Sequence, residues 1–212
     1  MLADIAKALH EGREQEVLEK VGAALDEHEA EAVLNEGLLN GMDLIGTDFK
    51  SGKMFVPEVL MAARTMHGAM EILKPHLAEG AVKSSGSVVI GTVAGDLHDI
   101  GKNLVIMMLE AGGFQVIDLG VDVSSDDFVK AVKDHSADLV GMSALLTTTM
   151  PEMEKVIQAL DEAGVRDAVS ILVGGAPVTR EFASEIGADG YASNASAALD
   201  LARDLVAKPG GS

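Results

Sequence analysis

The sequence predicts an α/β protein in two parts: a four-helix bundle over residues 1–80 and, after a linker at 81–86, a flavodoxin-like domain over residues 87–212. The second part is expected to hold a doubly wound, five-stranded parallel sheet. Two observations lead to this fold class. Apolar residues recur at helical spacing before residue 80, and short β-branched runs alternate with helical segments after it.

Four amphipathic helices are expected in the first part, over residues 2–10, 14–27, 29–49 and 57–78. Four such helices with short connections pack naturally as an antiparallel bundle. Pro57 suits the first turn of a helix, where the missing N–H costs no hydrogen bond. The segment 78–86 is small and polar, as linkers often are. Two apolar stripes carry the helix prediction: Leu34, Leu38, Met42, Ile45 and Phe49 in one helix, and Val59, Ala63, Met66, Met70, Leu73 and Leu77 in the other.

Strand and helix patterns alternate in the second part, as in βαβ units with a parallel sheet. In such folds ligands collect at the carboxyl ends of the strands, so the residues just after each strand are the candidates for function. Strands are expected at 87–93, 115–119, 138–142, 169–173 and 190–192, and helices near 102–112, 125–135, 150–163, 179–186 and 195–207.

The composition excludes several classes of function. The chain has 212 residues, 48% of them hydrophobic, and a net charge of −18, which disfavours nucleic acid and anionic membranes as partners. It has no cysteine, so disulfides, thiolate metal sites and a cysteine nucleophile are ruled out. Neither a signal peptide nor a membrane-spanning stretch is recognisable, and a soluble cytoplasmic protein is expected.

The segment GDLHDIGKN, residues 95–103, follows the first expected strand and contains a histidine between carboxylates. A lone loop histidine is usually a capping or hydrogen-bonding residue. Asp96, however, is placed to accept a hydrogen bond from one imidazole nitrogen of His98 and leave the other free for a metal. The other five histidines lie in expected helices without ligand spacing, so His98 cannot hold a bare metal ion. It can serve as an axial ligand to a metal held by a macrocycle.

The glycines can be compared with known ligand-binding loops. Their spacing around the first helix does not match the GxGxxG loop of dinucleotide-binding proteins, so a nicotinamide cofactor is disfavoured. Gly174 and Gly175 end an expected strand. They fit either a tight turn or a slot between sheet and helix for a long ligand tail.

Taken together, Asp96-x-His98-x-x-Gly101, Ser143-x-Leu145 and Gly174-Gly175 resemble the cobalamin-binding fingerprint of methionine synthase and of small corrinoid proteins in methyltransferase systems. The stretch GMDLIGTDFKSGKMFVPEVLMAARTM is similar to the helical cap that precedes the cobalamin domain in that family. The resemblance covers nearly the whole chain, and it makes residues 1–80 a cap domain.

The resemblance implies a role for each matching residue. His98 replaces the dimethylbenzimidazole base as the lower cobalt ligand, Asp96 holds its other nitrogen, and Thr149 extends this relay where methionine synthase has a serine. Phe49 and Val56 match the apolar residues that cover the upper face, the second of which is commonly leucine. By periodicity alone, Phe49 is bundle core. The remaining implied cofactor contacts are Gly95, Leu97, Asp99, Gly101, Ser143, Leu145, Thr147, Gly174, Gly175 and Ala195.

By the same resemblance the chain is a corrinoid methyl carrier that does not catalyse alone. Its cobalt accepts a methyl group through a donor-specific methyltransferase and passes it to a second methyltransferase acting on a folate or a thiol, and a separate reductive activator is implied. Methanol, a methylamine, a methoxylated aromatic or glycine betaine are all possible donors, because the partner recognises the donor. The alternatives are a cobalamin-binding sensor and a mutase subunit; a phosphoacceptor receiver is disfavoured because Ser143 ends the third strand.

Overall fold

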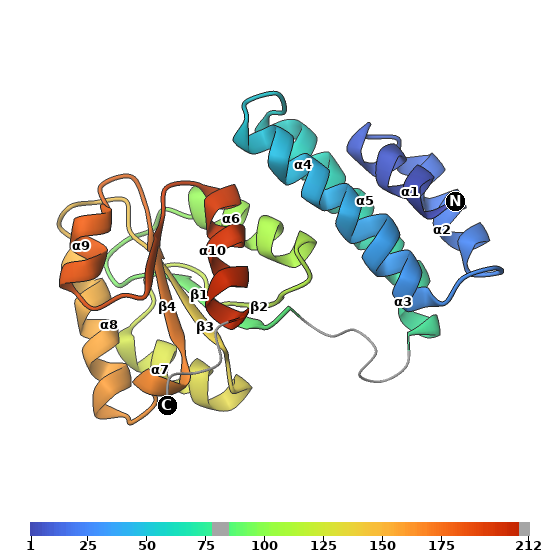
Figure 1. Cartoon of the computed structure of the whole chain (residues 1–212). Helices are drawn as coiled ribbons and strands as arrows, with labels where there is room; N and C mark the ends of the chain where they lie inside the picture. Colours follow the sequence, from blue (N-terminus) through green and yellow to red (C-terminus); the bar gives the residue numbers. More distant parts are fainter. Residues whose placement is uncertain (78–84, 208–212) are drawn as a thin grey trace. The chain divides into compact units, whose positions relative to one another are not determined.

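The computed structural model describes residues 1–77 and 85–207, which form a helical unit and an α/β unit (Figure 1). Each unit has its own buried apolar residues. Of the expected linker at 81–86, residues 81–84 lie outside the described residues.

The helical unit contains four long helical segments, as the apolar periodicity predicts. The second is shorter than expected and ends at Ala24, and the third runs unbroken through an α-helical start, a π-helical middle and an α-helical end. The elements are α1 (Leu2–His10), α2 (Glu14–Ala24), α3 (Ala30–Ala32), the π-helical η1 (Val33–Leu39), α4 (Asn40–Lys50), α5 (Val56–Leu73) and the 3₁₀ turn η2 (Lys74–His76).

Two glycines let α1 pack closely against the third segment. A Cβ built on Gly37 would lie 3.3 Å from Ile5 Cγ2, and one built on Gly41 would lie 3.0 Å from the Ala6 carbonyl oxygen. The two glycines are four residues apart and therefore share one helix face. Their lack of side chains lets the two backbones approach each other.

The buried stripe of α5 differs in part from the expected one. Ala62 and Ala69 are buried, whereas the expected Ala63 and Met70 are only partly buried. Apart from Thr65, the buried positions follow one another at intervals of three and four residues, the heptad spacing of helices that pack at a shallow angle. The full buried set in α5 is Val59, Ala62, Thr65, Met66, Ala69 and Leu73.

The α/β unit contains a five-stranded, wholly parallel sheet with the strand order β2-β1-β3-β4-β5. This order is that of the flavodoxin-like doubly wound fold, so the expected fold class is confirmed. Its elements are β1 (Ser87–Thr92), α6 (Ile100–Ala111), β2 (Gln115–Asp118), α7 (Ser125–His135), β3 (Leu139–Ser143), α8 (Met150–Glu162), η3 (Arg166–Ala168), β4 (Ser170–Gly174), α9 (Arg180–Glu185), β5 (Gly190–Ala192) and α10 (Ala195–Ala207).

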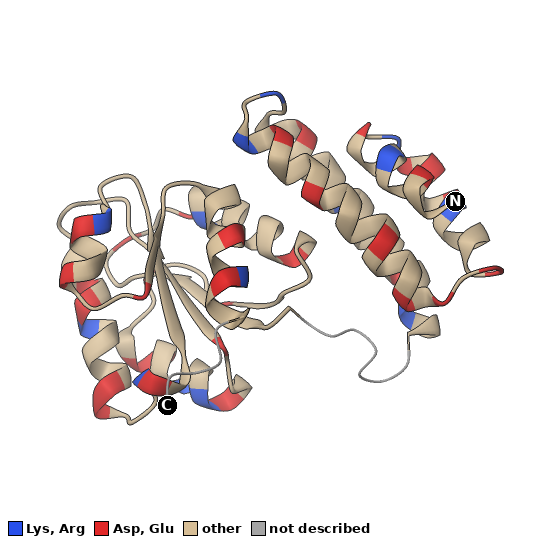
Figure 2. Cartoon of the chain, in the orientation of Figure 1, with Lys and Arg blue, Asp and Glu red and all other residues tan. Residues whose placement is uncertain are grey.

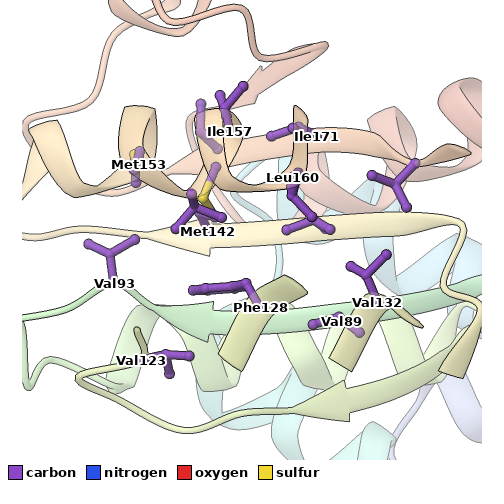
Figure 3. Packing of buried hydrophobic residues seen from close by; sticks show 14 of the residues in the cluster. Val89, Val93, Val123, Phe128, Val132, Met142, Met153, Ile157, Leu160 and Ile171 are labelled. Atoms are coloured by element: carbon purple, nitrogen blue, oxygen red, sulfur yellow. The ribbon is translucent and has the colours of Figure 1, made fainter. Parts of the chain in front are cut away.

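Helices cover both faces of this sheet. On one face, Phe128 and Val132 of α7 and Leu160 of α8 pack with strand residues in one apolar cluster (Figure 3). On the other face, residues of α6 and α10 pack against β4 and β5. Because the strands are parallel and buried on both faces, all five carboxyl ends meet at one edge, where the connecting loops can form a site.

Charged residues lie mainly on the helices, and the acidic ones occur on many helices of both units (Figure 2). Within residues 1–77 and 85–207, no helix combines the length and the hydropathy that a membrane span requires.

Candidate functional site

The histidine loop, residues 93–99, joins β1 to α6 at the carboxyl edge of the sheet. Its backbone is fixed at both ends of the turn. Val93 N donates to the Ser143 carbonyl at 3.1 Å, and the buried Thr92 hydroxyl donates to the His98 carbonyl at 2.8 Å. Gly95 adopts φ = +78°, a conformation in which glycine is favoured.

Asp96 is fully buried and accepts hydrogen bonds on both carboxylate oxygens. Oδ1 accepts from His98 Nδ1 at 2.7 Å and from His98 N at 3.1 Å. Oδ2 accepts from Leu145 N at 2.7 Å, from Leu146 N at 3.3 Å and from the Thr149 hydroxyl at 2.7 Å. The carboxylate therefore joins the histidine loop to the loop that follows β3.

These donors set the charge of Asp96. Burial by itself raises the pKa of this carboxyl, but the donors from Leu145, His98 and Thr149 outweigh burial and hold the pKa well below its usual range. Asp96 is therefore ionised and can only accept hydrogen bonds. It follows that His98 Nδ1 carries the hydrogen of this contact and donates a hydrogen bond to Asp96. In the tautomer with its hydrogen on Nδ1, Nε2 is the acceptor.

Thr149 lies at the N-cap position of α8 but makes no capping hydrogen bond there. Its hydroxyl lies 2.7 Å from Asp96 Oδ2 and 2.9 Å from the Leu146 carbonyl oxygen. A hydroxyl has one proton, and the carboxylate is the stronger acceptor. Thr149 thus orients Asp96, which orients His98.

The His98 side chain is 50% exposed, although its partner Asp96 is buried. The neighbouring apolar residues Leu97 and Ile100 are 71% and 85% exposed, and Leu145 and Leu146 are also exposed. A soluble protein rarely groups exposed apolar side chains beside a fixed imidazole without a ligand to cover them. The site can therefore bind a large, partly apolar group through Nε2.

The glycines of the site divide into two kinds. At Gly175, φ is +130° and a Cβ would lie 1.8 Å from the Ala144 carbonyl oxygen, so close backbone approach alone requires glycine. Gly101 lies in the first turn of α6, and a Cβ there would meet no atom within 4 Å. Nothing in the described protein explains a glycine at position 101, whereas a flat ligand beside His98 would.

The other expected contacts of the α/β unit lie at the same edge of the sheet. Ser143 ends β3 and is partly buried, Thr147 is exposed in the following loop, Ala195 is buried at the start of α10, and Asp99 is exposed just before α6. The Gly174 carbonyl accepts from Ala144 N at 3.2 Å, which ties the end of β4 to that of β3. The structure links Asp96, His98, Leu145 and Thr149 directly by hydrogen bonds.

The two remaining expected residues belong to the helical unit. Phe49 lies near the end of α4 and is partly buried, and Val56 begins α5 and is 40% exposed. Other exposed apolar side chains of that unit are Leu44, Phe55, Leu60 and Met61.

Three residues that support the histidine loop were not singled out from the sequence: Thr92, Leu146 and Asp122. The Asp122 carboxylate accepts from Gly95 N at 2.6 Å. Thr92 carries a detectable signal, because it is a polar residue at the end of an apolar strand. The contact of Asp122 spans 27 positions and has no local signal in the sequence.

No three histidine or carboxylate side chains converge on a metal position anywhere in residues 1–77 and 85–207. His98 can therefore take part in metal chemistry as a single ligand to a metal that brings its other ligands with it.

Known proteins are similar to this one over nearly the whole chain. Two family models match, both described as a B12 binding domain, one over residues 86–200 and the other over residues 1–74. Dimethylamine corrinoid protein 3 of Methanosarcina acetivorans is 44% identical over 206 residues, which are 97% of each protein. The dimethylamine corrinoid protein of Methanosarcina barkeri is 43% identical over 98% of each protein.

Solved structures are similar over the same extent. A cobalamin-binding protein from Desulfitobacterium hafniense superposes with a TM-score of 0.81 at 32% identity, covering 97% of this chain and 98% of the other. A chain of the methanol:cobalamin methyltransferase complex of Methanosarcina barkeri superposes with a TM-score of 0.86 at 33% identity, covering 97% of this chain and 79% of that one.

Proposed function

This chain belongs to the B12-binding family of corrinoid proteins, and from that premise we propose that it binds a corrinoid and carries a methyl group between two partner methyltransferases. The observation that carries the proposal is the pairing of a buried, ionised Asp96 with a half-exposed His98 whose Nε2 is left to accept. When bound, a corrinoid supplies a cobalt ion that can take up and release a methyl group.

The residues of the α/β unit fit this group. His98 Nε2 would be the lower cobalt ligand, and Asp96 keeps the ring in the required tautomer through the 2.7 Å bond to Nδ1. Thr149 holds Asp96 in place from the opposite side. Gly101 leaves open space in the first turn of α6, three residues after His98, and the exposed Leu97 and Ile100 offer apolar contact.

Further residues at the same edge would hold the rest of the ligand. Ser143 and Thr147 would contact the corrinoid or its nucleotide tail, and the tail would pass beside Gly174 and Gly175 towards Ala195. The glycine at 175 has a structural reason of its own, so a contact with the tail would be additional to it. Gly95 and Asp99 shape the histidine loop on either side of Asp96 and His98.

The helical unit is proposed to cover the methyl-bearing face, with Phe49 and Val56 as the covering side chains. Val56 is exposed at the start of α5, and covering an exposed apolar side chain with a ligand would be favourable.

Partner proteins belong to the proposal because one of the similar solved chains comes from a methanol:cobalamin methyltransferase complex. We propose one methyltransferase that delivers the methyl group, a second that removes it to a folate or thiol, and a reductive activator. Dimethylamine and methanol are the donors named for the relatives, and a methylamine is the first candidate here because those relatives are the more similar in sequence.

The test is the visible spectrum and cobalt content of purified protein reconstituted with cobalamin, for the wild type, H98A and H135A. Wild type and H135A, which alters an exposed histidine of the same unit, should bind near-equimolar cobalamin with the spectrum of a histidine-ligated, base-off form. H98A should give the base-off spectrum without a histidine ligand. A wild type that retains no cobalamin would overturn the proposal.

A further inference from the structure

The connection from β2 to α7, residues 119–124, continues beyond the strand alongside the end of β1. Leu119 N donates to the Ile90 carbonyl at 2.8 Å, Thr92 N to the Gly120 carbonyl at 3.0 Å, and Val123 N to the Thr92 carbonyl at 3.0 Å. This connection is therefore fixed to the strand from which the histidine loop departs.

Asp122 extends this contact into the histidine loop itself. Its carboxylate accepts from Gly95 N at 2.6 Å, and its own backbone N–H donates to the Asp96 carbonyl at 3.0 Å. Asp122 thus binds two consecutive residues of the loop, and the second of them is the residue that orients His98.

The backbone of Asp122 is held in a conformation that few residues adopt. Its φ is +54°, in the left-handed region where asparagine, aspartate and glycine are favoured. Of the residues that the structure describes, only Asp122 and Ser136 combine a side chain with a positive φ. The aspartate side chain at position 122 thus has two roles: its carboxylate accepts the hydrogen bond from Gly95 N, and it tolerates a left-handed backbone.

A second carboxylate of the same region holds the first turn of α6, which follows the histidine loop. The Lys102 side chain in the first turn of α6 is 1% exposed, and its Nζ donates to Asp118 Oδ1 at 2.7 Å and to Asn103 Oδ1 at 2.8 Å. Asp118 Oδ1 also accepts from Gly120 N at 2.9 Å. Asp122 therefore holds the histidine loop at Gly95 and Asp96, and Asp118 holds, through Lys102, the helical turn that follows the loop.

We propose that Asp122 is a positioning residue for the Asp96–His98 pair: by binding Gly95 and Asp96, it fixes the direction in which His98 presents Nε2 to the corrinoid. The effect on corrinoid binding rests on the proposed function, but the orientation of His98 by Asp122 does not require the cofactor. Partners that orient a metal ligand from outside its contact sphere commonly change metal affinity about 10- to 100-fold when they are removed.

Three substitutions separate the two properties of Asp122. D122N keeps an oxygen acceptor and tolerates the left-handed backbone, D122G permits the backbone but removes the acceptor, and D122A removes the acceptor and disfavours the backbone. The matched control is D189A. Asp189 likewise accepts a backbone N–H at 2.6 Å, from Ile171, but it does so near the start of β4, at the opposite edge of the sheet.

The first readout uses the protein without cofactor. Long-range ¹H–¹⁵N spectra at one fixed pH report which ring nitrogen of His98 carries the proton. Wild type, D122N and D189A should show a proton on Nδ1, whereas D122G and D122A should show a mixture. Because this measurement involves no corrinoid, it stands even where the proposed function fails.

The second readout is cobalamin titration followed by its visible spectrum. D122G and D122A should bind cobalamin about tenfold or more weakly, with a smaller share of the histidine-ligated form. D189A should lower the melting temperature without changing the spectrum. Wild-type tautomer and spectrum in D122G would overturn the inference. Wild-type protein that binds no cobalamin would overturn the proposed function instead.

Discussion

At Gly101, a larger side chain is expected to stabilise the helix but to weaken cofactor binding. Glycine within a helix costs up to about 1 kcal/mol relative to alanine. A Cβ at this position would meet no atom within 4 Å, and the backbone does not require glycine because φ is not positive. The unused space lies three residues after His98, where the corrinoid is proposed to bind.

We therefore predict opposite effects of G101A on two measurements. The free energy of unfolding without cofactor, measured in urea, should rise by a few tenths of a kcal/mol up to about 1 kcal/mol. The affinity for cobalamin should fall, and G101L should bind at least about tenfold more weakly than wild type, a loss of ~1.4 kcal/mol. If G101L bound as tightly as wild type, the space beside His98 would have another purpose.

The sequence identified part of the site because part of it is local. Asp96 and His98 are two residues apart, so their spacing made the hydrogen bond that the structure contains one of the alternatives, and the family resemblance favoured it. Thr149 lies 53 positions from Asp96, and only the family resemblance pointed to it. Asp122 was missed because its contact with Gly95 depends on a left-handed backbone after β2, which a single sequence does not disclose.

At the level of elements, hydrophobic periodicity located the helices and strands but not their irregularities. It predicted one helix over 29–49, and the structure has an uninterrupted helical segment over 30–50. The π-helical stretch Val33–Leu39 within it was not foreseen. Such a stretch adds a residue to the helical turn, and the periodicity of apolar residues carries no signal for it.

Close packing of α1 on α4 leads to a prediction about two helical glycines. A Cβ on Gly41 would lie 3.0 Å from the Ala6 carbonyl oxygen and 3.1 Å from Ala6 Cα, both backbone atoms that cannot move aside cheaply. G41A should therefore destabilise the protein by about 1–3 kcal/mol despite the better helix propensity of alanine.

The matched substitution is G22A in α2, where a Cβ would meet nothing within 4 Å. It should stabilise the protein by up to about 1 kcal/mol, because only helix propensity changes. Thermal unfolding followed by circular dichroism measures both variants. Stabilisation by both substitutions would mean that α1 and α4 are packed more loosely than the structure shows.

At the scale of the whole molecule, the two units divide the tasks of the proposed function. All hydrogen bonds described for Asp96, His98 and Thr149 come from the α/β unit, so His98, the proposed axial ligand, is positioned within one unit. The helical unit contributes exposed apolar side chains at the start of α5. The fold of both units followed from the sequence because their periodicities differ; the contribution of Phe49 and Val56 to a site in the other unit is still a prediction.

That contribution is tested by measuring access to the bound cofactor. If Val56 covers the upper face of cobalamin, V56A should increase the rate at which cyanide adds to protein-bound aquocobalamin by a few-fold, and F49A should increase it further. Val56 is 40% exposed, so its truncation should cost less than about 1.5 kcal/mol of stability, whereas the partly buried Phe49 should cost more.

The control for this prediction is M61A, on the same helix. Met61 is also exposed, and its Cε lies 3.6 Å from a Cβ built on Gly12, on the side of α5 that faces the α1–α2 connection. Its loss should leave the rate of cyanide addition unchanged. Equal rates in wild type, V56A and F49A would show that these two side chains serve only the bundle, and the protection of the methyl-bearing face would then have to come from other residues or from a partner methyltransferase.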